Sequence, residues 1–193
     1  MSSTSCTQRL APGHAATSTT SQKSLAAALG AFDLEGRVTD PIAAGASRAT
    51  VLLFVRNDCP ISNRYAPEIR RLQSRFGPEG VRFWLVHPVA EESPQSIRQQ
   101  AREYELKCDL LRDPNQFLVR RAKVRVTPEA AVFSAAGDLI YHGRIDDRFV
   151  DFGKERPAPT QHDLEQVLSA VLAGKMIAHA ATRAVGCYIP ELP

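Results

Sequence analysis

The pattern of hydrophobic positions predicts alternating strands and helices. Thr50–Val55 (TVLLFV) and Val81–Val86 (VRFWLV) are the short apolar runs typical of strands buried on both faces. Between them, one helical face carries Ile61, Tyr65, Ile69, Leu72 and Phe76. Pro67 falls inside that helix and predicts a kink. Two parallel strands joined by a helix form a β-α-β unit.

The rest of the chain continues this alternation. We expect a helical turn at Ser24–Leu29, a strand and turn over Ala31–Thr39, a helix from Ser93 to about Glu105, a short strand at Asp109–Leu111, a helix opened by Asp113, a hairpin of Ala130–Phe133 with Leu139–His142, and a last helix capped by Thr160 and ended by Gly174. The order predicts an α/β fold, a mixed central sheet with helices on both faces.

Length and composition indicate one folded domain. The 193 residues suffice for a sizeable core, and 44% hydrophobic with 23% charged residues is typical of soluble globular proteins. Residues 1–29 begin with a segment rich in Ser, Thr and Ala, which predicts a flexible tail. We therefore expect the domain to cover residues 30–193.

The charge and the apolar runs exclude two classes of partner. A net charge of +3 with scattered Lys and Arg gives no reason to expect nucleic-acid binding. No apolar stretch is long enough to span a bilayer, so no membrane partner is expected. Residues 1–23 lack the pattern of a secretory signal, which favours a cytoplasmic protein. A periplasmic location stays open if the start of the chain is misassigned.

Four cysteines, Cys6, Cys59, Cys108 and Cys187, are spread widely along the chain. They are too sparse for a disulfide-stapled scaffold, and no two form C-x-x-C, so no metal site is predicted. Cys6 lies in the expected tail, and Cys108 precedes a short buried strand and is expected in the core. At least one thiol is therefore available for chemistry.

Cys59 is the strongest candidate for that chemistry. It follows the first buried strand and precedes Pro60, which suits the first turn of a helix. The amide groups and dipole at a helix start favour negative charge, so the pKa of this thiol should be lowered. The thiolate is the nucleophilic form of cysteine. A buried structural thiol is the alternative.

A second segment that indicates a reactive site is Val126-Thr127-Pro128, just before the predicted strand Ala130–Phe133. Strand, Cys-Pro at a helix start and then Thr-Pro before a hairpin is a specific combination. We expect the Thr127–Pro128 peptide to be cis and to face Cys59, although a proline at a strand entrance is more often an ordinary turn residue.

These features together resemble the thioredoxin-like AhpC/TSA redoxins, in particular a peroxiredoxin-like subgroup. The resemblance runs from about Phe32 to the C-terminus. The matching segments are Asp58-Cys59-Pro60, Val124 to Glu129, Tyr141 to Asp147, the helix from His162 to Lys175, and Gly186-Cys187-Tyr188-Ile189. The resemblance implies a thioredoxin fold and a redox-active cysteine.

What the resemblance implies about function is a thiol–disulfide oxidoreductase or antioxidant redoxin. Cys59 would attack, while Pro60, Thr127 and Pro128 would shape the groove for a thiol or disulfide partner. Electrons would arrive through an external thiol reductant, so no cofactor is expected. Two alternatives remain: a thiol peroxidase that reduces peroxides, and a non-enzymatic module that binds a metal or partner through Cys59.

The chain departs from the known motifs in two places. Thioredoxins carry a second cysteine where this chain has Ser62, so no exchange can occur within the motif. Peroxiredoxins carry proline and threonine or serine where this chain has Leu52 and Arg56, which argues against fast peroxide turnover. Arg56 or, less favoured, Arg125 is a candidate substitute positive charge; an exposed, solvated arginine is the commoner role.

Five further positions stay open. The resemblance includes Gly186-Cys187, which implies that Cys187 resolves Cys59; an idle tail thiol is the alternative. His87, at the same sheet edge as Cys59, is either a thiolate-stabilising or metal-binding group or, as favoured, a loop histidine with no role. Arg144, Asp146 and Asp147 are expected to order the following loop through ion pairs.

Overall fold

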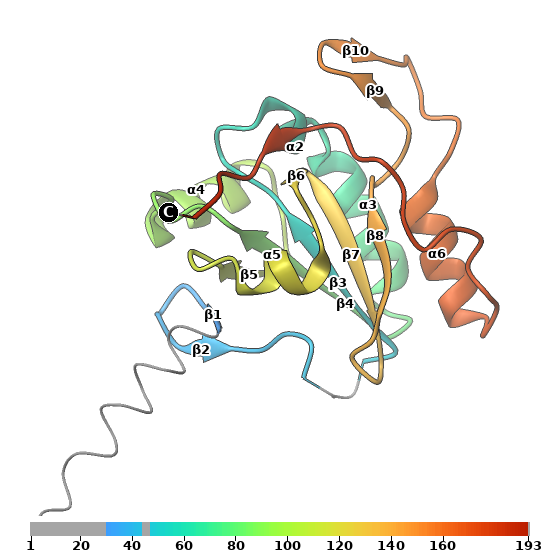
Figure 1. Cartoon of the computed structure of the whole chain (residues 1–193), viewed down its shortest axis with the longest axis horizontal. Coiled ribbons are helices and arrows are strands. Elements are labelled where there is room, and N and C mark those ends of the chain that lie inside the picture. Colours follow the sequence, from blue (N-terminus) through green and yellow to red (C-terminus); the bar gives the residue numbers. More distant parts are fainter. Residues whose placement is uncertain (1–29, 44–46, 193) are drawn as a thin grey trace, which may run out of the picture.

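The computed structural model describes residues 30–43 and 47–192. The expected tail over 1–29, with the helical turn at Ser24–Leu29 and Cys6, lies outside these residues. A seven-stranded sheet, in the order β2-β1-β5-β4-β3-β7-β8, forms the centre (Figure 1). Its strands are β1 Ala31–Phe32, β2 Val38–Thr39, β3 Ala49–Phe54, β4 Val81–His87, β5 Asp109–Arg112, β7 Glu129–Ser134 and β8 Leu139–Gly143. β3, β4 and β5 are parallel, whereas β7 is antiparallel to β3 and β8.

The helices and the remaining strands surround this sheet. The helices are α2 Pro60–Arg64, α3 Ala66–Phe76, α4 Pro94–Glu103, α5 Phe117–Ala122 and α6 Asp163–Leu172. Two small pairs complete the described chain: β9 Phe149–Asp151 with β10 Lys154–Glu155, and β6 Val126–Thr127 with β11 Cys187–Tyr188. None of the helices in the described part of the chain is long and apolar enough to cross a bilayer.

Strand β3 is buried along its whole length, as its continuous apolar run predicts. Its side chains alternate between two hydrophobic cores, so Val51 and Leu53 enter one while Leu52 and Phe54 enter the other. In register, Leu52 lies between Trp84 of β4 and Ala131 of β7. The central strand is therefore held on both faces and both edges.

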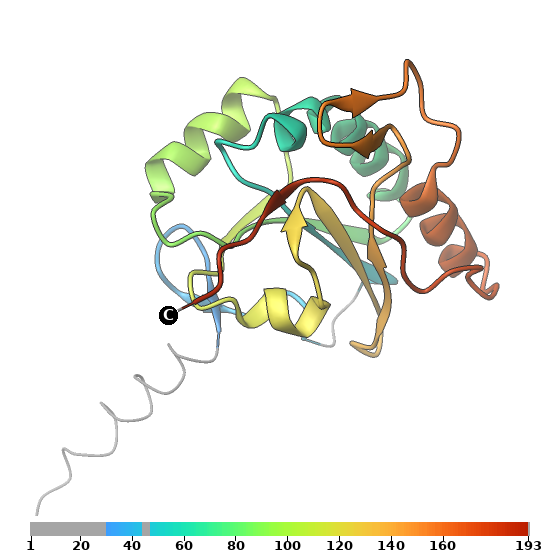
Figure 2. The same ribbon diagram turned by 45° about the horizontal axis from the view of Figure 1, so that its top comes forward.

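Helices cover both faces of the sheet, which confirms the predicted layers (Figure 2). The apolar sides of α2, α3 and α6 fill the core that contains Val51 and Leu53. The opposite core takes Leu118, Val119 and Ala122 of α5. This α/β arrangement is a thioredoxin fold with a mixed central sheet.

The expected kink is a break between α2 and α3. Tyr65 ends one helix and begins the next, and Pro67 stands at the start of α3, where its missing N–H is not needed. The Tyr65 ring is buried against Phe149, and its hydroxyl donates a 2.5 Å hydrogen bond to Asp146. The break lets α2 end shortly after Cys59 and leaves α3 to pack on the sheet.

The predicted cap of the last helix is wrong. α6 begins at Asp163 with His162 as its N-cap. The Thr160 hydroxyl and amide both donate 2.6 Å hydrogen bonds to Asp147 instead. Because both Thr160 donors bind the carboxylate of Asp147, which is distant in sequence, Thr160 closes a loop and does not cap the helix.

The C-terminal segment runs from the β8 edge of the sheet to the end of the sheet that carries Cys59. After α6 it runs beside β8, where the His142 amide donates to Ala180 and the Thr182 amide donates to His142. It then continues as β11 along β6, which Figures 1 and 2 both show. The tail therefore runs from β8, an edge strand of the sheet, to the residues just past the carboxyl end of β3.

Candidate functional site

Cys59 lies at the junction of strand and helix. It is the N-cap of α2, with Pro60 as the first helical residue, just past the carboxyl end of β3. Its own amide donates to Arg56 and its carbonyl accepts from Asn63, which fixes the backbone on both sides. Its side chain has no exposed surface. This is the location predicted for a reactive thiol.

The Thr127–Pro128 segment lies against Cys59. The peptide bond is cis, and the Cys59 thiol donates a 3.0 Å hydrogen bond to the Thr127 carbonyl. Thr127 itself is fully buried. Strand β6 thereby brings its backbone to the sulfur, although 68 residues separate the two in sequence.

Cys187 reaches the same place through strand pairing. β11 runs antiparallel to β6, with Cys187 opposite Thr127 and Tyr188 opposite Val126. The Thr127 hydroxyl donates to the Cys187 carbonyl at 3.4 Å. Gly186 packs so tightly that a Cβ there would overlap the Thr127 carbonyl oxygen. The structure thus brings Cys59, Pro60, Thr127, Pro128 and Cys187 together.

The environments of the two thiols separate their acidities. Burial acts to raise the pKa of Cys59, but its interactions with the Cys187 thiol and with the Ser62 hydroxyl and amide outweigh burial and lower that pKa. Burial and the neighbouring Cys59 sulfur raise the pKa of Cys187 to about 11. Cys59 is therefore the more acidic of the two thiols.

Cys108 differs from both. It is buried, and burial together with Asp109 raises its pKa to about 12. It packs in the hydrophobic core on the α3 side of the sheet. The prediction that Cys108 is a core residue is confirmed.

Arg56 contacts the tail directly. Its side chain is 18% exposed and forms a 2.7 Å ion pair with Asp58. Its guanidinium also donates to the Tyr188 carbonyl at 3.3 Å, and its charge acts to lower the pKa of Cys187. Arg56 is thus the arginine at the site, whereas Arg125 is exposed and contributes its backbone carbonyl to Ile189.

His87 serves the loop before Cys59. It is buried, and its Nδ1 lies 2.7 Å from a Glu92 carboxylate oxygen. The other Glu92 oxygen accepts the Asn57 amide at 2.6 Å. His87 therefore supports the loop through Glu92, and neither the thiolate-stabilising nor the metal-binding hypothesis gains from its position.

The loop has a second support that the sequence did not reveal. The Gln100 side chain donates to Asn63 at 2.7 Å, and Asn63 in turn donates to the Asn57 carbonyl at 3.1 Å. Glu92 and Gln100 belong to the segment after β4, far from Cys59 in sequence. Nothing in the local pattern marks them, because only the tertiary fold brings them to the loop.

Arg144, Asp146 and Asp147 are structural, as expected. Arg144 forms an ion pair with Asp163 at 2.7 Å, and Asp146 accepts from Tyr65. Burial alone would raise the pKa of Asp147, but hydrogen bonds from Thr160 and Gln161 hold it at about 2. These contacts order the loop that contains β9 and β10.

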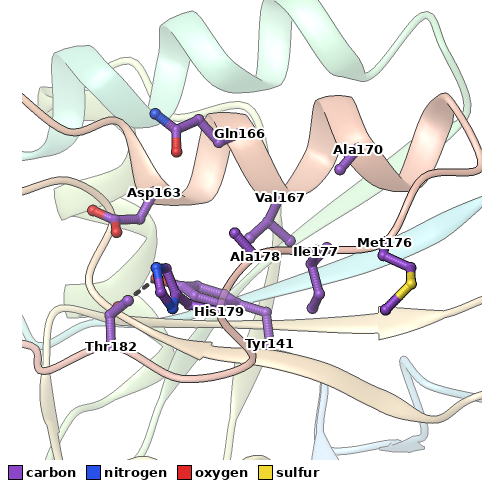
Figure 3. Close-up of a pocket in the computed structure, with 10 residues that line it drawn as sticks. All are labelled: Tyr141, Asp163, Gln166, Val167, Ala170, Met176, Ile177, Ala178, His179 and Thr182. Atoms are coloured by element: carbon purple, nitrogen blue, oxygen red, sulfur yellow. Dashed lines mark hydrogen bonds between the residues drawn. The ribbon is translucent and has the colours of Figure 1, made fainter.

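Two other features in the described residues lie apart from Cys59. The carboxylates of Glu68 and Glu165 and the ring of His162 lie close enough to hold a cation, but Arg71 and Arg75 already form ion pairs with these carboxylates. The other feature is a hollow of about 170 Å³ between α6, β8 and the tail. Figure 3 shows its lining, with Tyr141 hydrogen-bonded to Thr182 at 2.6 Å.

Comparison with known sequences identifies the family. The model of the AhpC/TSA family matches residues 25–142, more than half of the chain. The chain belongs to the AhpC/TSA family. The match includes Cys59 and the Thr127–Pro128 peptide but ends before α6 and β11. No sequence among curated proteins matches this AhpC/TSA chain.

Solved structures show the same fold. An uncharacterized conserved protein from Geobacillus kaustophilus is 23% identical with a TM-score of 0.71, over 86% of this chain and 90% of its own. A hypothetical protein from Sinorhizobium meliloti is 22% identical, with a TM-score of 0.70 and coverage of 82% and 87%. A thioredoxin-like protein from Porphyromonas gingivalis is 15% identical, with a TM-score of 0.57 and coverage of 79% and 95%. This AhpC/TSA chain is a thiol redox protein with a thioredoxin fold.

Proposed function

We propose that the protein is a thiol-dependent oxidoreductase in which Cys59 attacks the substrate and Cys187 resolves the product as an internal disulfide. The observation that carries this proposal is the pairing of β11 with β6, which places Cys187 opposite Thr127 and beside Cys59. Ser62 is no substitute, because a hydroxyl is a poor nucleophile toward sulfur.

The reaction begins with the Cys59 thiolate. On a disulfide substrate, the thiolate attacks one sulfur, a Cys59 mixed disulfide forms, and the other substrate sulfur leaves as a thiolate. The Cys187 thiolate then attacks Cys59, and the second substrate sulfur leaves. The substrate gains two electrons, and the Cys59–Cys187 pair is oxidised by two. An external thiol reductant restores both cysteines.

The environment of Cys187 changes in a way that favours this second step. In the reduced protein, the Cys59 sulfur is one of the causes that raise the pKa of Cys187. Once Cys59 carries the substrate sulfur, it is no longer a thiolate, so that cause is removed. The Arg56 charge continues to favour the Cys187 thiolate. Cys187 therefore becomes a better nucleophile when it is needed.

A thiol peroxidase is the second candidate, because Cys59 is fully buried and a small oxidant needs little space. The Cys59 thiolate would attack the peroxide oxygen, giving a sulfenic acid and an alkoxide or hydroxide; Cys187 would then displace water to form the same disulfide. Leu52 and Arg56 stand where peroxiredoxins carry proline and threonine or serine, which argues against rapid peroxide turnover. Second-order rates of Cys59 oxidation by hydrogen peroxide and by a small disulfide separate the two candidates.

Mass-spectrometric disulfide mapping tests the shared step. After one equivalent of mild oxidant, the wild-type chain is expected to contain a Cys59–Cys187 disulfide. Cys108→Ser should give the same map, whereas Cys187→Ser should accumulate a mixed disulfide or sulfenic acid on Cys59. A wild-type map without the Cys59–Cys187 bond, or a Cys187→Ser variant that recycles at the wild-type rate, would show that Cys187 does not resolve Cys59.

A further inference from the structure

Thr127 is the residue through which the two cysteine-bearing segments meet. Its carbonyl accepts a 3.0 Å hydrogen bond from the Cys59 thiol, and its hydroxyl donates to the Cys187 carbonyl at 3.4 Å. The same Thr127 carbonyl lies against Gly186, where a Cβ would overlap it. The placement of one backbone unit therefore sets how Cys187 lies relative to Cys59.

The strand that carries Thr127 is short and lies outside the central sheet. β6 covers only Val126–Thr127, and its strand partner among the described residues is β11, which is equally short. Two paired residues on each side supply few backbone hydrogen bonds, and so small a pair of strands is marginally stable on its own. A side chain anchored in the central sheet is needed to fix the position of Thr127.

Glu129 is that side chain. It is the buried first residue of β7, where it pairs in register with Phe54 at the carboxyl end of β3. Its carboxylate oxygen Oε2 accepts from the amides of Arg125 and Val126 at 2.8 and 3.2 Å. Hydrogen bonds to a carboxylate are shorter and stronger than those between neutral groups, and a buried site strengthens them further. The carboxylate thus ties β6 to the central sheet.

The second carboxylate oxygen extends this connection to the neighbouring strand. Oε1 of Glu129 lies 3.6 Å from Nδ1 of His142 on β8, and this nitrogen is buried without a hydrogen-bond partner in the described part of the chain. His142 also holds the tail through its backbone, which bonds to Ala180 and Thr182. Strands β6, β7 and β8 therefore meet at one buried carboxylate.

We propose that Glu129 is a positioning residue of the redox site: its carboxylate fixes β6, and β6 in turn fixes the Thr127 carbonyl against Cys59 and sets the register of Cys187. This rests on the proposed function, because the register matters when Cys187 attacks Cys59. Glu129 acts through the backbone of residues 125–127 and not on either sulfur. A displacement of about 1 Å at reacting atoms can slow a reaction by as much as a hundredfold, so the loss of this support should be visible in the chemistry.

Three substitutions at this position separate the hydrogen-bond acceptor from the shape of the side chain. Glu129→Gln retains an oxygen that can accept from the two amides, whereas Glu129→Met has a similar size and no such oxygen. Glu129→Asp withdraws the carboxylate by one methylene and takes the place of the Met variant if that chain does not fold. Asp147→Asn is the matched control, because Asp147 is also buried and accepts from two backbone amides, those of Thr160 and Gln161 at 2.6 and 2.9 Å.

The first measurement does not depend on Cys187. In the full chain with Cys187→Ala, alkylation of Cys59 is followed from about pH 5 to 10. The Thr127 carbonyl accepts a hydrogen bond from the Cys59 thiol, and a bond donated by the protonated form disfavours the thiolate. Glu129→Met should therefore move the profile to lower pH and speed alkylation at neutral pH about threefold. Glu129→Gln and Asp147→Asn should leave the profile in place.

The second measurement isolates the step that needs Cys187. The full chain with Cys6→Ser is mixed with one equivalent of a symmetrical, chromogenic aryl disulfide. The Cys59 thiolate attacks one sulfur and the first aryl thiolate leaves; the Cys187 thiolate then attacks Cys59, the internal disulfide forms and the second aryl thiolate leaves. Glu129→Met should slow the second release about tenfold or more, whereas Glu129→Gln should stay within about threefold of the unsubstituted chain.

The results that would overturn the proposal are distinct from those that concern the proposed function. An unchanged alkylation profile in Glu129→Met refutes the positioning role, and so do equal second-release rates in the Met and Gln variants. An equal shift of the profile in Asp147→Asn would assign the effect to lost stability alone. A wild-type chain that forms no Cys59–Cys187 disulfide would refute the proposed function, and the alkylation profile would still decide the role of Glu129.

Discussion

Cys187 lies beside Cys59: strand β11 pairs it with Thr127, whose carbonyl accepts a hydrogen bond from the Cys59 thiol, although the two cysteines are far apart in sequence. As a result, the pKa values of the two thiols shift in opposite directions. Burial acts to raise the pKa of Cys59, but the neighbouring Cys187 and Ser62 outweigh it and lower that pKa, while burial and the Cys59 sulfur raise the pKa of Cys187 to about 11. Cys59 is therefore the thiol of the pair that ionises more readily.

Removing the Cys187 thiol should make Cys59 less acidic. In Cys187→Ala, burial of Cys59 continues to raise its pKa, but the largest of the interactions that lower this pKa is lost. Because only the thiolate reacts, alkylation of Cys59 should slow at neutral pH and its profile should move to higher pH. Alkylation rates measured from pH 5 to 10 by mass spectrometry test this. Cys108→Ala serves as the control, and an unchanged profile in Cys187→Ala would contradict the expectation.

Introducing a cysteine at the position of Ser62 should redirect the disulfide. The Ser62 hydroxyl is buried, has no hydrogen-bond partner among the described residues, and lies close enough to Cys59 to lower its pKa. Ser62→Cys should therefore form its disulfide within α2 and leave Cys187 free for alkylation. Ser62→Ala should retain the Cys59–Cys187 disulfide. Disulfide maps of both variants after mild oxidation decide the matter; an unaltered map in Ser62→Cys speaks against the inferred geometry.

Gly186→Ala should separate the two cysteines. The added methyl group would overlap the Thr127 carbonyl, so β11 must move away from β6. Overpacking of this kind costs about 1–3 kcal/mol, so formation of the internal disulfide should slow by about tenfold or more. The rate is measured by quenching the oxidised protein with an alkylating agent. Gly153→Ala is the control, since nothing lies within 4 Å of its added Cβ; equal rates in the two variants would exclude tight packing at residue 186.

Asp147 should stabilise the fold in a pH-dependent way. Its carboxylate accepts from Thr160 and Gln161 at 2.6 to 2.9 Å, so Asp147→Asn should lower the free energy of unfolding by about 1–3 kcal/mol at neutral pH. The pKa of Asp147 is depressed to about 2. Its contribution is therefore complete above the unfolded value of about 4 and is lost as the pH falls toward 2.

Denaturant unfolding of wild type and Asp147→Asn, from pH 7 down to pH 3, measures this contribution. The difference between the two proteins should shrink as the solution becomes more acidic. Asp151→Asn is the control, because in the described part of the chain the Asp151 carboxylate accepts a hydrogen bond only from the adjacent Phe152 amide. A difference that stays constant with pH would show that Asp147 acts through packing and not through its charge.

Much of the fold followed from local patterns. The apolar run of β3 predicted a strand buried on both faces, since each face of a parallel strand packs on a layer of helices. Cys59-Pro60 predicted the start of α2, because proline suits the first helical turn. The Thr160 cap failed because its donors bind Asp147, a competition between distant residues that no local pattern records.

By itself, the sequence determined which cysteine occupies a strand-to-helix junction, and so which thiol is placed to become a thiolate. Periodicity and the Cys-Pro pair are local, and local rules suffice for them. The motifs and the resemblance also predicted Thr127–Pro128 and Cys187 beside Cys59, but only the tertiary structure decided how they meet it: through the Thr127 carbonyl, the Arg56 contact with the tail, and the register of Cys187 on β6. A two-residue strand such as β11 has no periodicity of its own. It forms because the β6 edge supplies its hydrogen-bond partners.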